Sequence, residues 1–156
     1  MSKKRTTPSP EEIDQLDSML KELLNPKVHH LGSDDHSVKR YDKRTNMYGG
    51  TGVVYLLQMF NDDELVNNRI GAYMILPTSE DSCGFHTHGT RSEQEIYLVV
   101  NGRGEYLEKK NWDSKVKSFP LEKGNLTTVR GDAFHAVKNT GDQPLIIFVI
   151  TTNEPD

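Results

Sequence analysis

The sequence predicts an all-β domain, a sandwich or barrel, preceded by one N-terminal α-helix. Three observations predict this fold. Nine short stretches with strand character follow residue 49, clusters of Gly, Asn, Asp and Pro separate them, and no long helical pattern interrupts them. The chain has 156 residues, which suits a single domain that buries its own hydrophobic core.

The N-terminal segment carries a clear helix signal after a short tail. Residues 1–8 are small, polar and basic, and we predict that they form a disordered tail. Ser9 suits the N-cap, Pro10 the first helical position, and Glu12 the last position of a capping box. Apolar residues then recur at helical spacing until Asn25-Pro26 ends the element: Ile13, Leu16, Leu20, Leu23 and Leu24. This apolar stripe must pack on the chain's own barrel or on a partner subunit, and we favour the barrel.

Residues 28–46 are polar and lack periodicity, so we predict an irregular connection. Residues 9–47 then form the helix and its connection, and residues 48–156 form the barrel. We interpret His29, His30 and His36 as solvated loop histidines. Asn101-Gly102 predicts a hairpin turn. The expected strands span residues 53–60, 69–76, 85–88, 95–100, 104–108, 116–121, 126–129, 133–138 and 145–151.

Composition excludes several classes of partner. The formal net charge of −4 argues against binding to a nucleic-acid backbone, which needs clustered Lys and Arg. No apolar run approaches the roughly 18 residues of a membrane span. The single cysteine, Cys83, cannot form an internal disulfide, and we expect it to fill a gap in the core. With no secretory signal at the N-terminus, we expect a cytoplasmic protein.

Three histidines and a glutamate form the pattern that carries chemistry. His86 and His88 are two residues apart in an expected strand, so both imidazoles point to one face and can bind one ion. A turn after His88 returns Glu95 beside them, and a register shift of two residues would put Glu93 there instead. His135 adds a third imidazole from a distant segment. Such a ligand set suits iron, manganese, nickel, zinc or copper, and leaves coordination positions open to a substrate.

The spacing of these residues resembles the two motifs of the cupin superfamily. His86-x-His88 follows Gly84, Glu95 precedes Gly102 by the family's interval, and His135 lies between Gly124 and Asn139. The resemblance implies a double-stranded β-helix, or jelly-roll barrel, and a divalent transition metal bound by His86, His88, Glu95 and His135. The interval from His88 to Glu95 is longer than usual by two residues. Because Glu95 keeps the family's spacing to Gly102, we prefer Glu95 to Glu93 as the ligand.

The resemblance also implies a function. It favours a metal-dependent enzyme acting on a small polar metabolite, through isomerase, dioxygenase, decarboxylase or other lyase chemistry, among which the sequence does not choose. The alternative is a noncatalytic cupin that binds a sugar or another metabolite. A homodimer formed through a barrel sheet is expected from the family.

Three side chains near the ion are candidates for catalysis or substrate binding. Glu93 is a candidate base. Tyr97 shares the strand face of Glu95 and offers a hydroxyl. Arg130 replaces the proline that the family usually has before the second histidine motif, and an arginine there can bind a carboxylate or phosphate through two hydrogen bonds.

Overall fold

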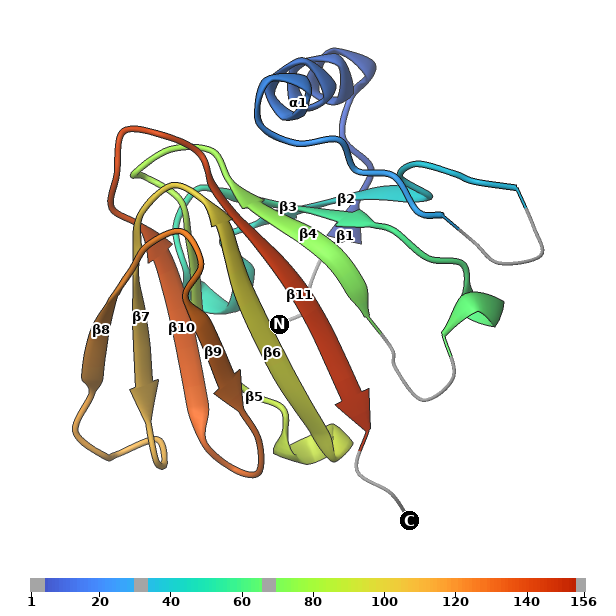
Figure 1. Cartoon of the computed structure of the whole chain (residues 1–156). Coiled ribbons are helices and arrows are strands. Elements are labelled where there is room, and N and C mark those ends of the chain that lie inside the picture. The colour runs from blue at the N-terminus through green and yellow to red at the C-terminus, as the bar shows by residue number, and fades with distance from the viewer. Residues whose placement is uncertain (1–4, 30–33, 66–69, 154–156) are drawn as a thin grey trace.

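The computed structural model describes residues 5–29, 34–65 and 70–153, which form one α-helix and two antiparallel sheets (Figure 1). The larger sheet has the strand order β1-β2-β3-β4-β11-β6-β9, and the smaller one has the order β5-β10-β7-β8. The two sheets confirm the predicted double-stranded β-helix. The elements are β1 (Arg5–Thr6), α1 (Pro10–Leu23), β2 (Arg40–Thr45), β3 (Val53–Gln58), β4 (Gly71–Leu76), β5 (Ser82–Thr87), β6 (Glu93–Asn101), β7 (Gly104–Lys109), β8 (Lys117–Leu121), β9 (Leu126–Val129), β10 (Phe134–Asn139) and β11 (Leu145–Asn153), with the short 3₁₀ turns η1 (Met47–Gly49), η2 (Asp62–Glu64) and η3 (Gly89–Arg91).

Alternation along the strands of the larger sheet creates two apolar layers. On β3, Val54 and Leu56 face the smaller sheet, whereas Tyr55 and Leu57 face outward. The inner layer is the main core and includes Met74, Leu76, Cys83, Tyr97, Val99, Tyr106, Val137, Ile147 and Val149. Cys83 is buried in this layer, as expected of an apolar filler.

Helix α1 covers the outward-facing layer, so it packs on the barrel of its own chain (Figure 1). Leu16 and Leu20 are each 2% exposed and pack with Leu57, Ile75 and Ile146. Burying two leucines stabilises this arrangement by about 1.5 to 3 kcal/mol each.

Glu12 fixes the start of the helix and ties it to the sheet. Its carboxylate accepts from the Ser9 backbone in the predicted capping box, and its other oxygen accepts from Tyr55 Oη at 2.5 Å and pairs with Lys43 Nζ at 2.7 Å. Hydrogen bonds from Lys43, Tyr55 and Ser9 lower the pKa of Glu12 to about 2.

Two N-terminal strands were not expected from the sequence. Arg5 and Thr6, assigned to a disordered tail, pair with Arg44 and Lys43 as strand β1. Strand β2 lies in the segment that we expected to be irregular. Its inward face is polar, because Asp42 and Arg44 lie opposite Leu56 and Val54, and this hides the alternation by which a half-buried strand is recognised.

The expected hairpin at Asn101-Gly102 is wrong. Strand β6 pairs with β11 and β9, whereas β7 pairs with β10 and β8, so this turn passes the chain from one sheet to the other. Gly102 does have a positive φ of 84°, and a Cβ there would overlap the Pro144 carbonyl oxygen. Turn chemistry was therefore identified correctly, but it does not specify which strands pair.

Some expectations fall outside the described residues: His30, the start of the second strand at Arg69, residues 1–4 and residues 154–156. His29 is exposed and pairs with Asp35. His36 is not solvated as expected, since its side chain is 12% exposed and Nε2 lies 2.7 Å from Glu64 Oε1. Within the described ranges, no helix has the length and apolar character needed to cross a bilayer.

Candidate metal centre

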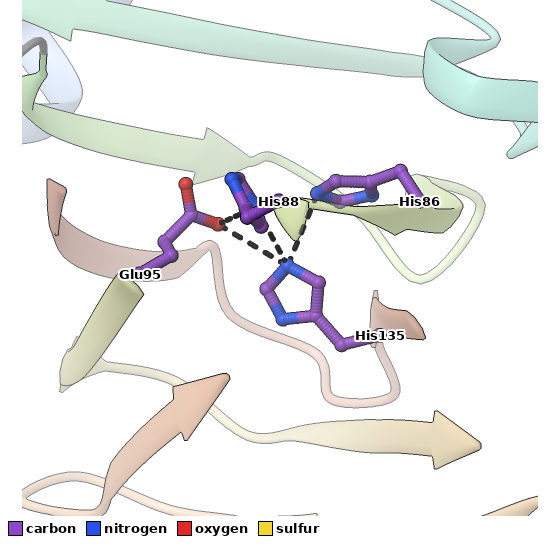
Figure 2. Close-up of side chains that lie close together, drawn as sticks. All are labelled: His86, His88, Glu95 and His135. Carbon is purple, nitrogen blue, oxygen red and sulfur yellow. Dashed lines mark hydrogen bonds and ion pairs between the residues drawn. The ribbon is translucent and has the colours of Figure 1, made fainter. Parts of the chain in front are cut away.

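Four buried side chains converge between the two sheets, at the place where β5, β6 and β10 approach one another (Figure 2). His86 on β5 and His135 on β10 are cross-strand partners in the smaller sheet. His88 directly follows β5, and Glu95 reaches across from β6 of the larger sheet. The four residues that the sequence nominated as metal ligands therefore meet, although they come from three strands.

The ligand-type atoms of this cluster lie within 4.8 Å of one another. The Nε2 atom of His135 is 3.1 Å from Nε2 of His86 and 3.2 Å from Nε2 of His88. Glu95 Oε1 is 3.2 Å from His88 Nε2 and 3.3 Å from His135 Nε2. Atoms bound about 2.1 Å from one ion and about 90° apart lie roughly 3.0 Å from each other, so these separations fit a shared divalent ion.

Hydrogen bonds on the far side of each ring orient the histidines. His86 Nδ1 donates to the Gly84 carbonyl oxygen at 2.9 Å, and His88 Nδ1 donates to Glu93 Oε1 at 3.0 Å. His135 Nδ1 lies 3.1 Å from Tyr106 Oη. With its Nδ1 proton engaged, each of these two rings can present an Nε2 lone pair to an ion at the centre of the cluster, as metal ligands do.

Burial and neighbouring charges shift the pKa values of three members of the cluster. Burial, followed by repulsion from His135, lowers the pKa of His86 to about 3, so this ring is neutral. Burial also lowers the pKa of His88, but Glu95 and Glu93 outweigh it and raise the net pKa. For Glu95, burial is outweighed by hydrogen bonds from His135 and His88, which hold its pKa well below the usual range. A divalent cation would satisfy the carboxylate in place of a proton.

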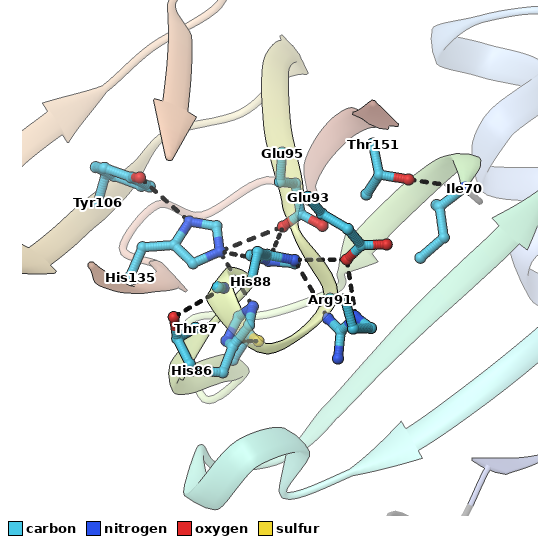
Figure 3. Close-up of polar contacts among 12 residues, drawn as sticks. Ile70, His86, Thr87, His88, Arg91, Glu93, Glu95, Tyr106, His135 and Thr151 are labelled. Atoms are coloured by element: carbon cyan, nitrogen blue, oxygen red, sulfur yellow. Dashed lines mark hydrogen bonds and ion pairs between the residues drawn. The ribbon is translucent and has the colours of Figure 1, made fainter. Parts of the chain in front are cut away.

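Glu93 lies outside the cluster and supports it (Figure 3). Its buried carboxylate accepts from His88 Nδ1 at 3.0 Å and from Arg91 Nε at 2.8 Å. The structure thus separates the two candidate carboxylates: Glu95 faces the three Nε2 atoms, and Glu93 holds His88 from behind. A carboxylate engaged by two donors is poorly placed to act as a free base.

The other two candidates differ in location. Tyr97 is buried beside the cluster, with its ring centroid 5.2 Å from that of His135. Burial, with the charge of Glu95, raises the pKa of Tyr97 well above its ordinary value, so it remains a neutral hydroxyl. Arg130 is exposed and does not line the cavity beside the cluster. The structure does not bring it to the site.

Sequence reasoning missed two contributors. Tyr48, with a positive φ of 52°, stacks on His86 at a centroid distance of 4.1 Å. The stack depends on Gly84, because a Cβ there would overlap the Tyr48 carbonyl oxygen. Arg91 binds Glu93, and its position two residues before Glu93 was the available signal. Nothing in the pattern around Tyr48 indicated its role.

Comparisons with known proteins support the fold. No protein-family model matches the chain, and neither does any curated protein. Among solved structures, a predicted oxalate decarboxylase from Thermotoga maritima is 25% identical with a TM-score of 0.64, over 73% of this chain and 92% of that one. The cupin domain of Schizosaccharomyces pombe Cnp3 is 10% identical with a TM-score of 0.56, over 84% of this chain and 87% of that one.

A second oxalate decarboxylase structure is 19% identical with a TM-score of 0.53, over 67% of this chain but only 26% of that chain. The similarity there is confined to one part of a larger protein. The chain therefore has the double-stranded β-helix fold of the cupin proteins.

Proposed function

We propose that this protein is a metal-dependent cupin enzyme acting on a small polar metabolite. One divalent transition metal would be bound by His86, His88, Glu95 and His135. The observation that carries the proposal is the convergence of three Nε2 atoms and a carboxylate oxygen within 4.8 Å, in a buried site. The alternative is a noncatalytic metabolite-binding cupin, which would bind the same ion without turnover.

When bound, the ion would act as a Lewis acid that polarises an oxygen atom of the substrate. The protein's own groups orient the ligands: Glu93 holds His88, and the Gly84 carbonyl holds His86. Tyr97 provides a neutral hydroxyl next to Glu95. None of the candidates Glu93, Tyr97 and Arg130 has the position and charge of a general base. This favours decarboxylase or oxygenase chemistry, in which a protein base is less central than in isomerisation.

One neighbour in the structure search gives further support. The Thermotoga maritima protein is described as a predicted oxalate decarboxylase, and it aligns over nearly its whole length. This is consistent with a lyase acting on a small acid.

Elemental analysis of protein purified without added metal tests the proposal. We expect about one transition-metal ion per chain in the wild type and a sharp loss in His86→Ala and His135→Ala. His29→Ala is the matched control, because His29 is an exposed loop histidine whose side chain is 76% accessible. Stoichiometric metal in both His86→Ala and His135→Ala would contradict the assignment. The metal-loaded wild type is then assayed for turnover of small carboxylic and hydroxycarboxylic acids, and binding without turnover would favour the alternative.

A further inference from the structure

A small cavity beside the metal cluster is rich in arginine. Its volume is about 50 Å³, and Arg5, Arg44 and Arg91 line it together with His86, His88 and Glu95. The three arginines come from β1, β2 and η3, which lie far apart in the sequence. This concentration of positive charge is unexpected in a chain whose formal net charge is −4.

Arg44 has an unsatisfied donor in this setting. Its Nε is buried without a hydrogen-bond partner, and no other buried side-chain nitrogen or oxygen of the described residues lacks one. Leaving a charged donor unpaired away from water is costly. Arg44 also lies directly opposite Arg5 in the β1–β2 ladder, and like charges in that position repel.

The nearby carboxylates are already engaged by other groups, Asp42 and Glu93 by arginines and Glu95 by His88 and His135. Asp42, on the same strand face as Arg44, lies 3.1 Å from Arg40 Nε and 3.6 Å from Arg5 Nε. Glu93 is bound to Arg91 Nε at 2.8 Å. Arg44 faces the interior, since its cross-strand partner Val54 belongs to the core between the sheets. The cavity therefore contains a guanidinium for which the described residues supply no acid.

The volume of the cavity limits the size of an acid that could pair with Arg44. Pockets for drug-sized ligands occupy about 300–1,000 Å³, so about 50 Å³ accommodates only a short molecule, such as an acid of two or three carbon atoms. A sugar phosphate is too large for this space, whereas a short organic acid fits. Guanidinium groups bind planar carboxylates through paired hydrogen bonds, which Arg44 can offer.

We infer that this cavity binds a short organic carboxylate, with one end at the metal cluster and a carboxylate group held by Arg44. The inference rests on the proposed function, because it assumes that an ion occupies the cluster. It assigns Arg44 a binding role and gives the substrate a chemical class.

Calorimetric titration of the metal-loaded protein tests the inference, with malonate as the probe and malonamide as its neutral isostere. We expect malonate to bind and malonamide not to bind. Arg44→Gln should weaken malonate binding by about 10- to 100-fold, the effect of losing charged hydrogen bonds. Arg130→Gln, an exposed arginine outside the cavity, is the matched control and should bind malonate like the wild type. Inorganic phosphate is titrated separately, and tighter binding of phosphate than of malonate would overturn the carboxylate assignment.

Two further measurements separate the possible failures. Metal content is determined in every sample. If the wild type holds no ion, the proposed function is contradicted. If ion-loaded Arg44→Gln binds malonate as tightly as the wild type, only the present inference is contradicted. Without malonate, Arg44→Gln should be at least as stable to urea as the wild type, since the repulsion with Arg5 is removed. A loss of stability would instead make Arg44 structural and overturn the inference. If Arg44→Gln does not fold, Arg44→Lys replaces it, and its lost bidentate geometry should still weaken binding severalfold.

Discussion

Glu93→Gln and Glu95→Gln should weaken metal binding to different extents, because the two carboxylates stand on opposite sides of His88. Glu95 Oε1 lies 3.2 Å from His88 Nε2 and 3.3 Å from His135 Nε2, so its replacement removes an anionic ligand. Glu93 contacts only the far side of the ring, through His88 Nδ1 at 3.0 Å. Removing such a supporting group typically costs 10- to 100-fold in metal affinity, or about 1.4 to 2.7 kcal/mol.

Glutamine at position 93 keeps one acceptor oxygen, so the lower end of that range, about tenfold, is expected there. Glu95→Gln should lower the metal affinity by more than this tenfold loss. The assay is competition of the zinc-loaded protein against a chromophoric chelator, with circular dichroism to verify folding. Glu105→Gln is the matched control, because Glu105 pairs with Lys138 at 3.3 Å on a partly exposed surface. Equal losses, or a larger loss in Glu93→Gln, would refute the assignment of Glu95 as ligand and Glu93 as its support.

Three other perturbations test the fold around the site. Leu20→Ala should reduce the free energy of unfolding in urea by about 2 to 5 kcal/mol without changing metal content, since Leu20 packs in the outer apolar layer between α1 and the larger sheet. Gly84→Ala should cost about 1 to 3 kcal/mol and also lower metal content, because the new Cβ would overlap the Tyr48 carbonyl oxygen and disturb the stack on His86. Metal-free protein should lose stability on acidification, by about 2 kcal/mol from His86 alone between pH 7 and pH 5. The pKa of His86 is about 3 in the folded protein and 6.5 in the unfolded chain, so the unfolded chain takes up the proton first. Urea unfolding at both pH values measures this, and unchanged stability would contradict the neutral, buried His86.

The sequence was sufficient for the parts of this protein that follow local rules. The capping box at Ser9 and Glu12 defines the start of α1, and alternation on β6 places Glu95 and Tyr97 on one buried face. The interval between His86 and His88 fits two rings on one side of a strand. These features depend on periods of 3.6 or 2 residues, which a sequence displays directly.

Features that depend on pairing between distant segments of the chain could not be predicted from the sequence in the same way. Strand β2 carries charge on its inward face, so its polar pattern resembled that of a loop. In the structure Arg44 lines the cavity and Asp42 pairs with Arg40 and Arg5, which explains why both point inward. The turn at Gly102 has the local conformation expected of a hairpin, yet its flanking strands belong to different sheets. Local chemistry sets the shape of a turn, whereas tertiary packing selects the strands that pair.

Helix α1 also has a consequence for assembly. It occupies the apolar outer surface of β3, β4 and β11, burying Leu57, Ile75 and Ile146 within one polypeptide. A second copy that docked there would have to displace the helix and the ion pair between Glu12 and Lys43. Any self-association must therefore use a different face, and mutations under α1 should act on the folding of each subunit and leave the equilibrium between subunits unchanged.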